Sequence, residues 1–333
     1  MKPFWALRVH APDEERGEPF ARLEQLNFSD LSPGNVTIEV HYSGVNYKDA
    51  LAGSGKGRIL KKFPLNGGID ASGIVLESSD SRFKVGQQVL VNGCGIGESV
   101  DGGYSEVLRV AGDSIVPLPP GLSLREAMIL GTAGFTAALA LHRMEQNGQH
   151  PELGRIAITG ASGGVGSFAI QLFHQRGYKV VAISGKHDAI RTLKDLGADE
   201  VIAPEQLELG SRPLESVQFG GAVDNVGGPL LAKLLAHTQL WGNVASIGMA
   251  QSAELHGSVL PFILRGVSLL GASSNNCARE LRHSLWRKLG KEWRPKQLDS
   301  LVARTVGLKD LTLAFDDLLH RRVHGRILVE IRR

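Results

Sequence analysis

Two stretches of the chain combine residue types and spacing that could do chemistry. The first, residues 155–166, reads Arg-Ile-Ala-Ile-Thr-Gly-Ala-Ser-Gly-Gly-Val-Gly, and a helical pattern follows from Ser167. A strand, a tight turn and a helix in this order direct backbone N–H groups at a helix start toward a pyrophosphate. Gly163 would allow close approach and Gly166 close helix packing, although Ala161 stands where the strict fingerprint has glycine. We therefore predict dinucleotide binding; the alternative is a tight turn in an α/β sheet that binds nothing.

The segment after the next strand indicates which dinucleotide binds. Residues 179–184 have the composition of a strand, which ends where an NAD-preferring fold places a carboxylate on the adenosine ribose. Here Ser184, Gly185 and Lys186 follow instead. A lysine with a hydroxyl suits a ribose 2′-phosphate, which a carboxylate would repel. The sequence thus predicts NADPH as cofactor; a lysine solvated on a loop is the alternative, because Asp188 is only two residues further on.

The second stretch, residues 44–52, gathers polar side chains with functional groups that could take part in catalysis. Asn46, Tyr47, Lys48 and Asp49 follow one another there. Such a cluster fits a catalytic cleft better than a simple turn, and Tyr47, Asn46 and Asp49 are our candidate catalytic residues. The alternative is a surface helix that Asn46 caps.

Length and composition restrict the classes of protein. A chain of 333 residues exceeds one ordinary core, so two domains are expected. Hydrophobic content of 42% and charged content of 21% are typical of soluble globular proteins, and a formal charge of +3 does not indicate nucleic-acid binding. With no membrane-length apolar run and no apolar signal core, we expect a cytoplasmic protein. Two cysteines, Cys94 and Cys277, are too few for a disulfide framework or a cysteine-rich zinc site.

The candidate residues need two kinds of scaffold, and the sequence indicates both. Residues 1–125 predict a twisted β domain, whose strand signals lie at 36–42, 73–76, 85–91, 104–110 and 115–118. A Pro-Pro-Gly boundary at 119–121 and a capping box from Ser123 to Glu126 then open helices at 127–130 and 131–140.

After the glycine turn, strand and helix signals alternate, which predicts an α/β fold with a doubly wound parallel sheet. Its remaining segments are strands at 179–184, 200–202, 221–226, 242–248 and 267–272 and helices at 189–196 and 230–237. In the tail, a helix at 278–293 has a core-facing stripe of Leu281, Leu285, Leu289 and Trp293, and its basic residues predict a solvated face. A helix at 311–319 and a strand at 325–331 follow, and the strand is expected to return to the β domain. The expected domains are 1–125 completed by 300–333, then 126–275, with 276–299 as a helical connection.

Taken together, the whole chain resembles the medium-chain dehydrogenase/reductase superfamily, within it the zinc-free branch of acryloyl-CoA reductases and quinone oxidoreductases. The resemblance implies a GroES-like catalytic domain built from both chain ends, a Rossmann NADPH-binding domain between them, and a homodimer joined through the Rossmann sheets. The motifs that carry it are Asn46-Tyr-Lys-Asp-Ala-Leu51, Gly55-Lys-Gly57, Gly68-Ile-Asp70, Gly131-Thr-Ala-Gly-Phe-Thr-Ala137, Thr159-Gly-Ala-Ser-Gly-Gly-Val-Gly-Ser167 and Pro261-Phe-Ile-Leu-Arg265.

By position, the family pattern implies a set of cofactor contacts. Departures lie at Pro204, where the branch often has arginine, and at His320-Arg321, where it often has asparagines. Tyr47 and Thr132 are implied as cofactor contacts. The pyrophosphate would be bound by Ser162, Gly163, Gly164 and Val165, and the 2′-phosphate by Ser184, Gly185 and Lys186. Along the ribose and nicotinamide the implied contacts are Asn225, Ile247 and Ser273, and near the phosphates Arg326.

The resemblance also bears on metals. Zinc-dependent relatives hold their metal with cysteine and histidine ligands, and the corresponding places here look like Asn46 and Gly68-Ile-Asp70. Without thiolate and imidazole ligands a tetrahedral zinc has too few partners. We therefore predict no metal.

A zinc-free site with NADPH suits hydride delivery to the β-carbon of a double bond conjugated to a carbonyl, followed by protonation of the enolate at the α-carbon. The expected substrate is acryloyl-CoA or a similar short 2-enoyl-CoA. Tyr47 would lie beside the nicotinamide as proton donor or as a cofactor hydrogen bond, and the glycine-rich loop at 93–103 would shape the substrate cleft. Reduction of a quinone and a non-catalytic NADPH-binding protein are the alternatives. No nucleic-acid or membrane partner is expected.

Overall fold

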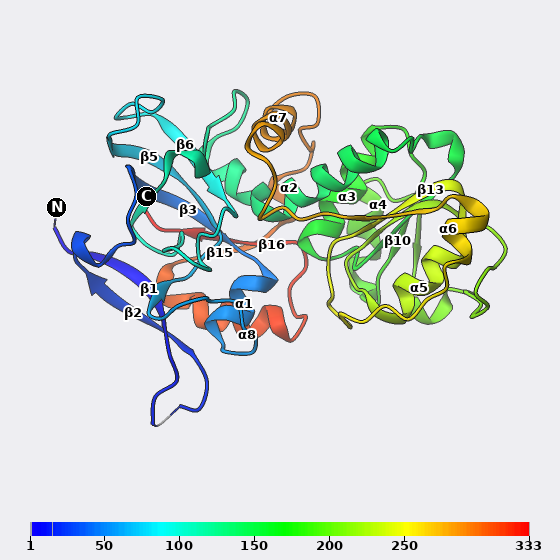
Figure 1. Ribbon diagram of the computed structural model, residues 1–333, viewed down its shortest axis with the longest axis horizontal. Coiled ribbons are helices and arrows are strands. Elements are labelled where there is room, and N and C mark those ends of the chain that lie inside the picture. Colours follow the sequence, from blue (N-terminus) through cyan, green and yellow to red (C-terminus); the bar gives the residue numbers. More distant parts are fainter. Residues whose placement is uncertain (1, 15, 333) are drawn as a thin grey trace. The chain divides into compact units, whose positions relative to one another are not determined.

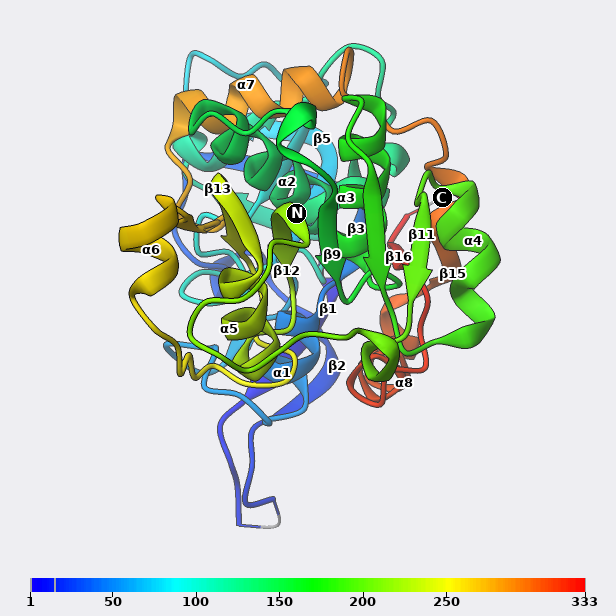
Figure 2. The ribbon, with the colours of Figure 1, turned by 90° about the vertical axis from the view of Figure 1, so that its right-hand side faces the viewer.

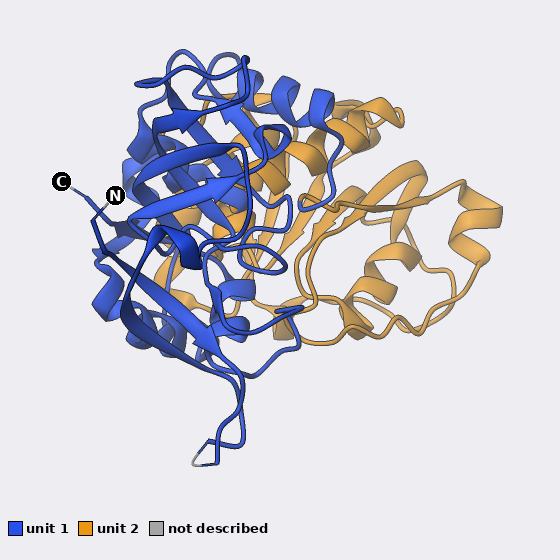
Figure 3. Ribbon diagram, turned by 60° about the vertical axis from the view of Figure 1, so that its left-hand side comes forward, with its two compact units in different colours: residues 1–132, 275–292, 298–333 blue, residues 133–274, 293–297 orange. Residues whose placement is uncertain are grey.

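The computed structural model describes residues 2–14 and 16–332. Two compact units divide the chain, shown in different colours in Figure 3. Unit 1 comprises residues 1–132, 275–292 and 298–333, and unit 2 comprises residues 133–274 and 293–297. Both ends of the chain therefore contribute to unit 1, and so does most of the segment 276–299.

Unit 1 contains two β-sheets and three helices of its own (Figure 1). The smaller sheet has the order β2-β1-β4, and the larger has the order β15-β16-β3-β5-β6-β8 with β7 paired to β3. The strands are β1 (Phe4–His10), β2 (Phe20–Leu26), β3 (Val36–Val45), β4 (Leu65–Asn66), β5 (Asp70–Ser78), β6 (Gln88–Asn92), β7 (Val107–Val110), β8 (Ile115–Pro117), β15 (Val302–Val306) and β16 (Arg326–Glu330), and the helices are α1 (Tyr47–Gly53), α7 (Arg279–Leu289) and α8 (Leu311–Leu319).

The larger sheet buries alternate side chains of the first part of β3 in the core of unit 1. Val36, Ile38 and Val40 are buried on β3 and join one core cluster with residues of β5, β6, β7 and β8. As predicted, the last strand returns to this sheet: β16 pairs antiparallel with β3, with Ile327 opposite Val45. The β1–β2 hairpin was not predicted, because β2 reads Phe-Ala-Arg-Leu-Glu-Gln-Leu, whose charged and amide side chains do not have strand character.

Unit 2 is a six-stranded sheet with the order β11-β10-β9-β12-β13-β14, and all its pairs are parallel. Figure 2 shows β9, β12 and β13 within it. Strands with both faces covered are mostly apolar: β10 is apolar throughout, and β9 is apolar up to Thr159 at its end. The strands are β9 (Ile156–Thr159), β10 (Val180–Ile183), β11 (Glu200–Ile202), β12 (Phe219–Asp224), β13 (Thr238–Ser246) and β14 (Ser268–Gly271), and the helices are α3 (Gly164–Gln175), α4 (Ile190–Asp195), α5 (Gly228–Ala236) and α6 (Leu260–Arg265).

Helix α2 (Leu124–Gln146) begins in unit 1 and ends in unit 2. Its backbone leaves the helical conformation at Gly131, where φ is 48°, so the two predicted helices are present on either side of a bend. A Cβ at Gly131 would lie 2.6 Å from Asp70 Oδ2, and only glycine leaves that space. α2 is long and apolar enough to cross a membrane, but 83% of its most apolar window is buried, which is typical of a soluble protein's core helix.

Helix α7 corrects one prediction. Leu285 and Leu289 are buried as expected, and Trp293 beyond the helix is buried too. Arg282, however, does not belong to a solvated face: it is 2% exposed and donates hydrogen bonds to Asn92 and to the backbone oxygen of Asn275. A local sequence pattern does not reveal this contact, because Asn92 lies 190 residues away in the chain.

Candidate active site

The sheet of unit 2 gathers the predicted cofactor residues of that unit at one edge. Because the strands are parallel, their carboxyl ends meet there, at the edge where such sheets bind ligands. Each candidate segment follows the end of a different strand. These are residues 162–165 after β9, 184–186 after β10, Asn225 after β12, Ile247 after β13 and Ser273 after β14.

Helix α3 begins within the glycine turn, at Gly164, with Gly163 as its N-cap. The predicted start was Ser167, three residues later. A Cβ at Gly163 would meet only Gly160 O at 3.3 Å, so the turn is open on that side. A Cβ at Gly166 would lie 2.5 Å from Gly160 O and 2.7 Å from Ala161 Cα, and this close packing requires glycine. The turn therefore has the space and the helix start that a pyrophosphate needs.

Side-chain hydroxyls join the two segments predicted to bind phosphates, residues 162–165 and 184–186. Ser184 is buried and its Oγ donates to Ser162 Oγ at 3.2 Å, while the backbone N–H of Lys186 donates to Ser184 Oγ at 3.2 Å. Gly185 between them is exposed, and Lys186 is half-buried. These hydrogen bonds fix the backbone of Lys186, the predicted partner of the 2′-phosphate.

Asn225 is held by the end of β9. Its backbone N–H donates to Thr159 Oγ1 at 2.9 Å and its Nδ2 donates to Thr159 O at 2.7 Å. Thr159 Oγ1 in turn donates to Asp224 Oδ1 at 2.7 Å, and burial raises the pKa of Asp224. Asn225 Oδ1 is buried and accepts no hydrogen bond. A buried acceptor without a donor is costly, so this atom fits a ligand hydroxyl or amide, and the edge as a whole fits a dinucleotide.

In unit 1, a buried carboxylate joins two predicted site residues. Asp70 at the start of β5 is fully buried. It accepts hydrogen bonds from Thr132 Oγ1 at 2.7 Å, from the Thr132 N–H at 2.9 Å and from Asn46 Nδ2 at 2.8 Å. Because these donors come from α2 and from the residue before α1, Asp70 fixes both segments in one arrangement.

Arg326 at the start of β16 completes this cluster from the opposite end of the chain. Its Nε donates to Ile129 O at 3.0 Å and its Nη1 donates to Asn46 Oδ1 at 3.0 Å, while Nη2 lies 3.9 Å from Asp70 Oδ2. Arg326 is 3% exposed, and Nη2, which makes no hydrogen bond, is buried as well. Its proximity to the cofactor phosphates stays a prediction, whereas its contacts with Asn46 and Asp70 are direct.

Asp49 is the second buried carboxylate of the cluster. Its oxygens accept hydrogen bonds from the Asn46 N–H at 2.9 Å, from Asn46 Nδ2 at 3.1 Å and from the Ile69 N–H at 2.9 Å. Burial raises the pKa of Asp49 to about 7, and the negative charge of Asp70 acts in the same direction. Burial also raises the pKa of Tyr104 well above its usual range, so this tyrosine, whose hydroxyl donates to Gly44 O, is neutral.

The alternative of a capped helix at Asn46 is half right. Helix α1 begins at Tyr47 with Asn46 at the N-cap, but the Asn46 side chain is turned toward Asp70 and Arg326. Asp49 performs the capping instead, because its carboxylate accepts from the Asn46 N–H. The first helical residue, Tyr47, is 45% exposed. The accessible phenol of Tyr47 is therefore next to a buried, hydrogen-bonded cluster that includes Asp49 and Asp70.

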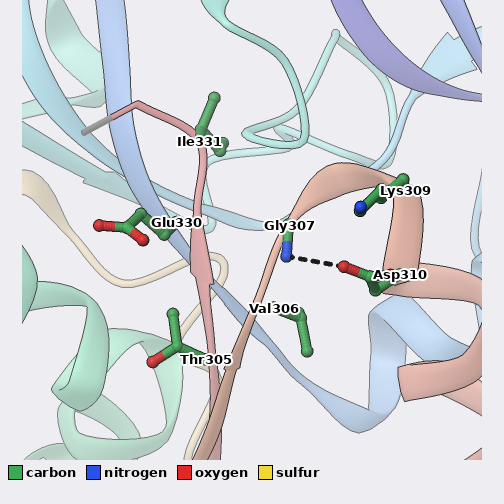
Figure 4. A pocket seen from close by; sticks show the side chains of 7 residues that line it. All are labelled: Thr305, Val306, Gly307, Lys309, Asp310, Glu330 and Ile331. Carbon is green, nitrogen blue, oxygen red and sulfur yellow. Dashed lines mark hydrogen bonds between the residues drawn. The ribbon is translucent and has the colours of Figure 1, made fainter.

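A cavity of about 470 Å³ lies elsewhere in unit 1, between the ends of β15 and β16 and the turn before α8 (Figure 4). Gly307 N–H donates to Asp310 Oδ2 across its wall at 3.3 Å. None of the predicted site residues lines it; its lining consists of Thr305, Val306, Gly307, Lys309, Asp310, Glu330 and Ile331.

Comparison with known proteins identifies the family. The zinc-binding dehydrogenase family matches residues 164–290, and the alcohol dehydrogenase GroES-like domain matches residues 32–120. Acrylyl-CoA reductase AcuI of Ruegeria pomeroyi is 41% identical over 320 residues, which is 96% of this chain and 97% of that protein. The chain belongs to the medium-chain dehydrogenase/reductase superfamily.

Solved structures of two bacterial members of this superfamily match this chain over almost its whole length. The yhdH oxidoreductase from Salmonella enterica, in complex with NADP, has a TM-score of 0.94 at 43% identity and covers 98% of this chain and 100% of its own. Bacillus subtilis yhfP, with NAD bound, has a TM-score of 0.95 at 44% identity and covers 99% of this chain and 100% of its own. The predicted GroES-like and Rossmann architecture is thereby confirmed.

The residues of this chain do not fit a catalytic zinc. The oxygens of Asp70 accept from Thr132 and Asn46, the Oδ1 of Asn46 accepts from Arg326, and a guanidinium cation takes the place next to the carboxylate. Among the residues that the structure describes, no group of three His, Cys, Asp or Glu side chains could hold a metal ion. The donor set thus lacks the nitrogen and sulfur ligands that zinc requires.

Two residues of the cluster were missed as site residues. Asp70 was noted only as part of a motif, and Tyr104 only as the first residue of a strand signal. A signal for Asp70 existed: an acidic residue at the start of a predicted buried strand needs a buried partner. Nothing in the sequence indicated which partners these are.

Proposed function

We propose that this oxidoreductase uses NADPH to reduce the conjugated double bond of a short 2-enoyl-CoA, with acryloyl-CoA as the leading substrate. The observation that carries the proposal is the end-to-end similarity to an acrylyl-CoA reductase, 41% over 96% of the chain, together with the five loops at the edge of the unit 2 sheet. Bound NADPH supplies the hydride. The chain's own residues would bind the cofactor, hold the thioester and manage one proton.

Several of the candidate residues have a defined part in this proposal. Residues 162–165 bind the pyrophosphate, Ser184 and Lys186 the 2′-phosphate, and Asn225 the ribose or nicotinamide through its unsatisfied Oδ1. Thr132 and Asn46, both fixed by Asp70, position the reacting groups. Tyr47 either donates the proton to the α-carbon or hydrogen-bonds the cofactor.

A parallel turnover assay tests the proposal. NADPH absorbance is followed with acryloyl-CoA, crotonyl-CoA and a benzoquinone at equal concentrations. We expect oxidation that is fastest with acryloyl-CoA. Faster turnover of the quinone would support a quinone oxidoreductase, and no oxidation with any acceptor would support a non-catalytic NADPH-binding protein.

We also propose a homodimer that forms through unit 2 in the cytoplasm. Strand β14 is at the end of the parallel sheet, so one side of it is free of intrachain strand pairing. Large apolar side chains near α6 are exposed: Trp241, Val259, Ile263 and Leu264 are each between 59% and 70% accessible. Such a patch is costly in water and is typical of an interface. Light scattering on the wild type and on Ile263→Asp checks this: a monomeric wild type would contradict it.

A further inference from the structure

A loop of unit 1 has an unusual concentration of positive charge. Residues 54–64, here called the cationic loop, follow α1 directly and contain Lys56, Arg58, Lys61 and Lys62 without any acidic residue. All four side chains are exposed. Their four charges exceed the formal net charge of the entire chain, which is +3.

These four cations have no carboxylate partner in the described part of the chain. Other exposed arginines of unit 1 do: Arg22 pairs with Glu24, Arg82 with Asp80 and Asp113, and Arg322 with Asp316 and Asp317. A solvated protein face normally mixes both signs of charge. What sets the cationic loop apart is that it gathers four such charges within residues 56–62, and this concentration favours an anionic ligand.

The loop has a defined conformation that returns toward the predicted site. Gly55 has φ of 73°, and a Cβ there would lie 2.6 Å from Pro19 O, so the loop packs closely on the β1–β2 hairpin. The Lys61 N–H donates to Glu98 O at 2.7 Å, and the Glu98 carboxylate pairs with Lys48 on the first turn of α1. Burial lowers the pKa of Lys48, and the nearby charge of Lys61 acts in the same direction. Glu98 thus connects Lys61 of the loop with Lys48, the residue next to Tyr47.

The cationic loop and Tyr47 are at opposite ends of α1, so a substrate could bind its anionic groups at the loop and react near Tyr47. Helix α1 has seven residues, which corresponds to about 10 Å between Tyr47 and the start of the loop. Coenzyme A has the same division: the acyl thioester is at one end, and a pyrophosphate and a 3′-phosphate are at the other. A quinone has no anionic group that the loop could bind.

From this we infer that the cationic loop is the binding site for the phosphates of the coenzyme A part of the substrate, and that it selects acyl-CoA over uncharged acceptors. The inference rests on the proposed function and adds the residues that determine its substrate class. Exposed lysines act as point charges in water, so their effect on binding falls as salt is added.

The test compares two thioesters that differ only in the phosphorylated nucleotide, acryloyl-CoA and acryloyl-pantetheine. The variant Lys56→Gln/Arg58→Gln/Lys61→Gln/Lys62→Gln should lower kcat/KM for acryloyl-CoA at least about tenfold at low salt, through KM. Acryloyl-pantetheine should be reduced as by the wild type, and the KM for NADPH should not change. Lys84→Gln/Arg287→Gln/Lys291→Gln/Lys309→Gln removes four exposed charges elsewhere in unit 1 and is the matched control.

Equal losses with both thioesters, no loss with either, or the same loss in the control variant would each overturn the inference. A binding measurement separates it from the proposed function. Calorimetry with adenosine 3′,5′-bisphosphate, in the presence of saturating NADP⁺, should show binding to the wild type and at least tenfold weaker binding to the loop variant. If the wild type reduces acryloyl-CoA but does not bind the bisphosphate, the loop site is refuted and the proposed reaction is not. If it binds the bisphosphate but does not reduce the thioester, the proposed reaction is refuted and the loop site is not.

Discussion

The buried carboxylate of Asp49 makes stability depend on pH in a direction opposite to that of most carboxylates. Its pKa is about 7 in the folded protein, against an ordinary value of 3.8. Between these values the folded state keeps a proton that the unfolded chain has released. The contribution of Asp49 to stability is therefore fully present below pH 4 and is lost as the pH rises to about 7.

The size of this effect follows from the two pKa values. Each unit of difference corresponds to about 1.4 kcal/mol, and integration from pH 5 to pH 8 gives a loss of roughly 2–3 kcal/mol. Other groups titrate in the same interval, so the comparison is made with Asp49→Asn. This variant has no charge at position 49 in either state. Its free energy of unfolding should rise relative to the wild type by roughly 2–3 kcal/mol between pH 5 and pH 8.

Urea unfolding at both pH values, followed by circular dichroism, provides the measurement. Asp49→Asn loses acceptors for the Asn46 backbone N–H and side-chain amide, so it carries a constant penalty of about 1–3 kcal/mol that cancels in the comparison. Asp70→Asn is the second control: without the neighbouring charge the pKa of Asp49 falls, and the pH dependence moves to lower pH. If the wild type and Asp49→Asn keep the same difference at both pH values within about 1 kcal/mol, the reasoning is refuted.

Four further experiments test individual residues and the metal. Lys186→Asp should raise the KM for NADPH by roughly tenfold or more and leave NADH almost unaffected, because a charged hydrogen bond to the 2′-phosphate is lost; equal losses in steady-state kinetics would contradict the assignment. Tyr47→Phe should lower turnover roughly 100-fold if Tyr47 is the acid, and unchanged turnover would remove it from the mechanism. Thr132→Val removes the hydroxyl donor to Asp70 and should lower the free energy of unfolding by about 1–3 kcal/mol, a loss that urea titration would reveal or disprove. Elemental analysis of purified protein should find far less than one zinc per chain; stoichiometric zinc would show that the ligand argument is wrong.

Features that depend on local sequence were predictable. The glycine turn, the alternation on β3 and the apolar strands of unit 2 each require only neighbouring residues, and they lie close to their expected positions. The edge that gathers Ser162, Ser184 and Asn225 also followed, since parallel strands determine where their carboxyl ends lie.

Features that depend on distant partners were not. Asp70 contacts Asn46 and Thr132, which are 24 and 62 residues away, and Arg326 reaches Asn46 across 280 residues. A burial pattern shows that such a charge will be inside, but not which group compensates it. For the same reason Arg282 was assigned to solvent although it is buried against Asn92.

The arrangement of the unit 2 loops has a consequence for how cofactor preference can change. The turn after β9 and the segment after β10 come from separate strands, and the hydroxyls of Ser162 and Ser184 join them. We therefore expect a substitution at position 186 to change the preferred nucleotide while the predicted pyrophosphate turn keeps its shape. Two solved relatives with NADP and with NAD bound, each more than 40% identical to this chain, show that both nucleotides occur on almost the same backbone.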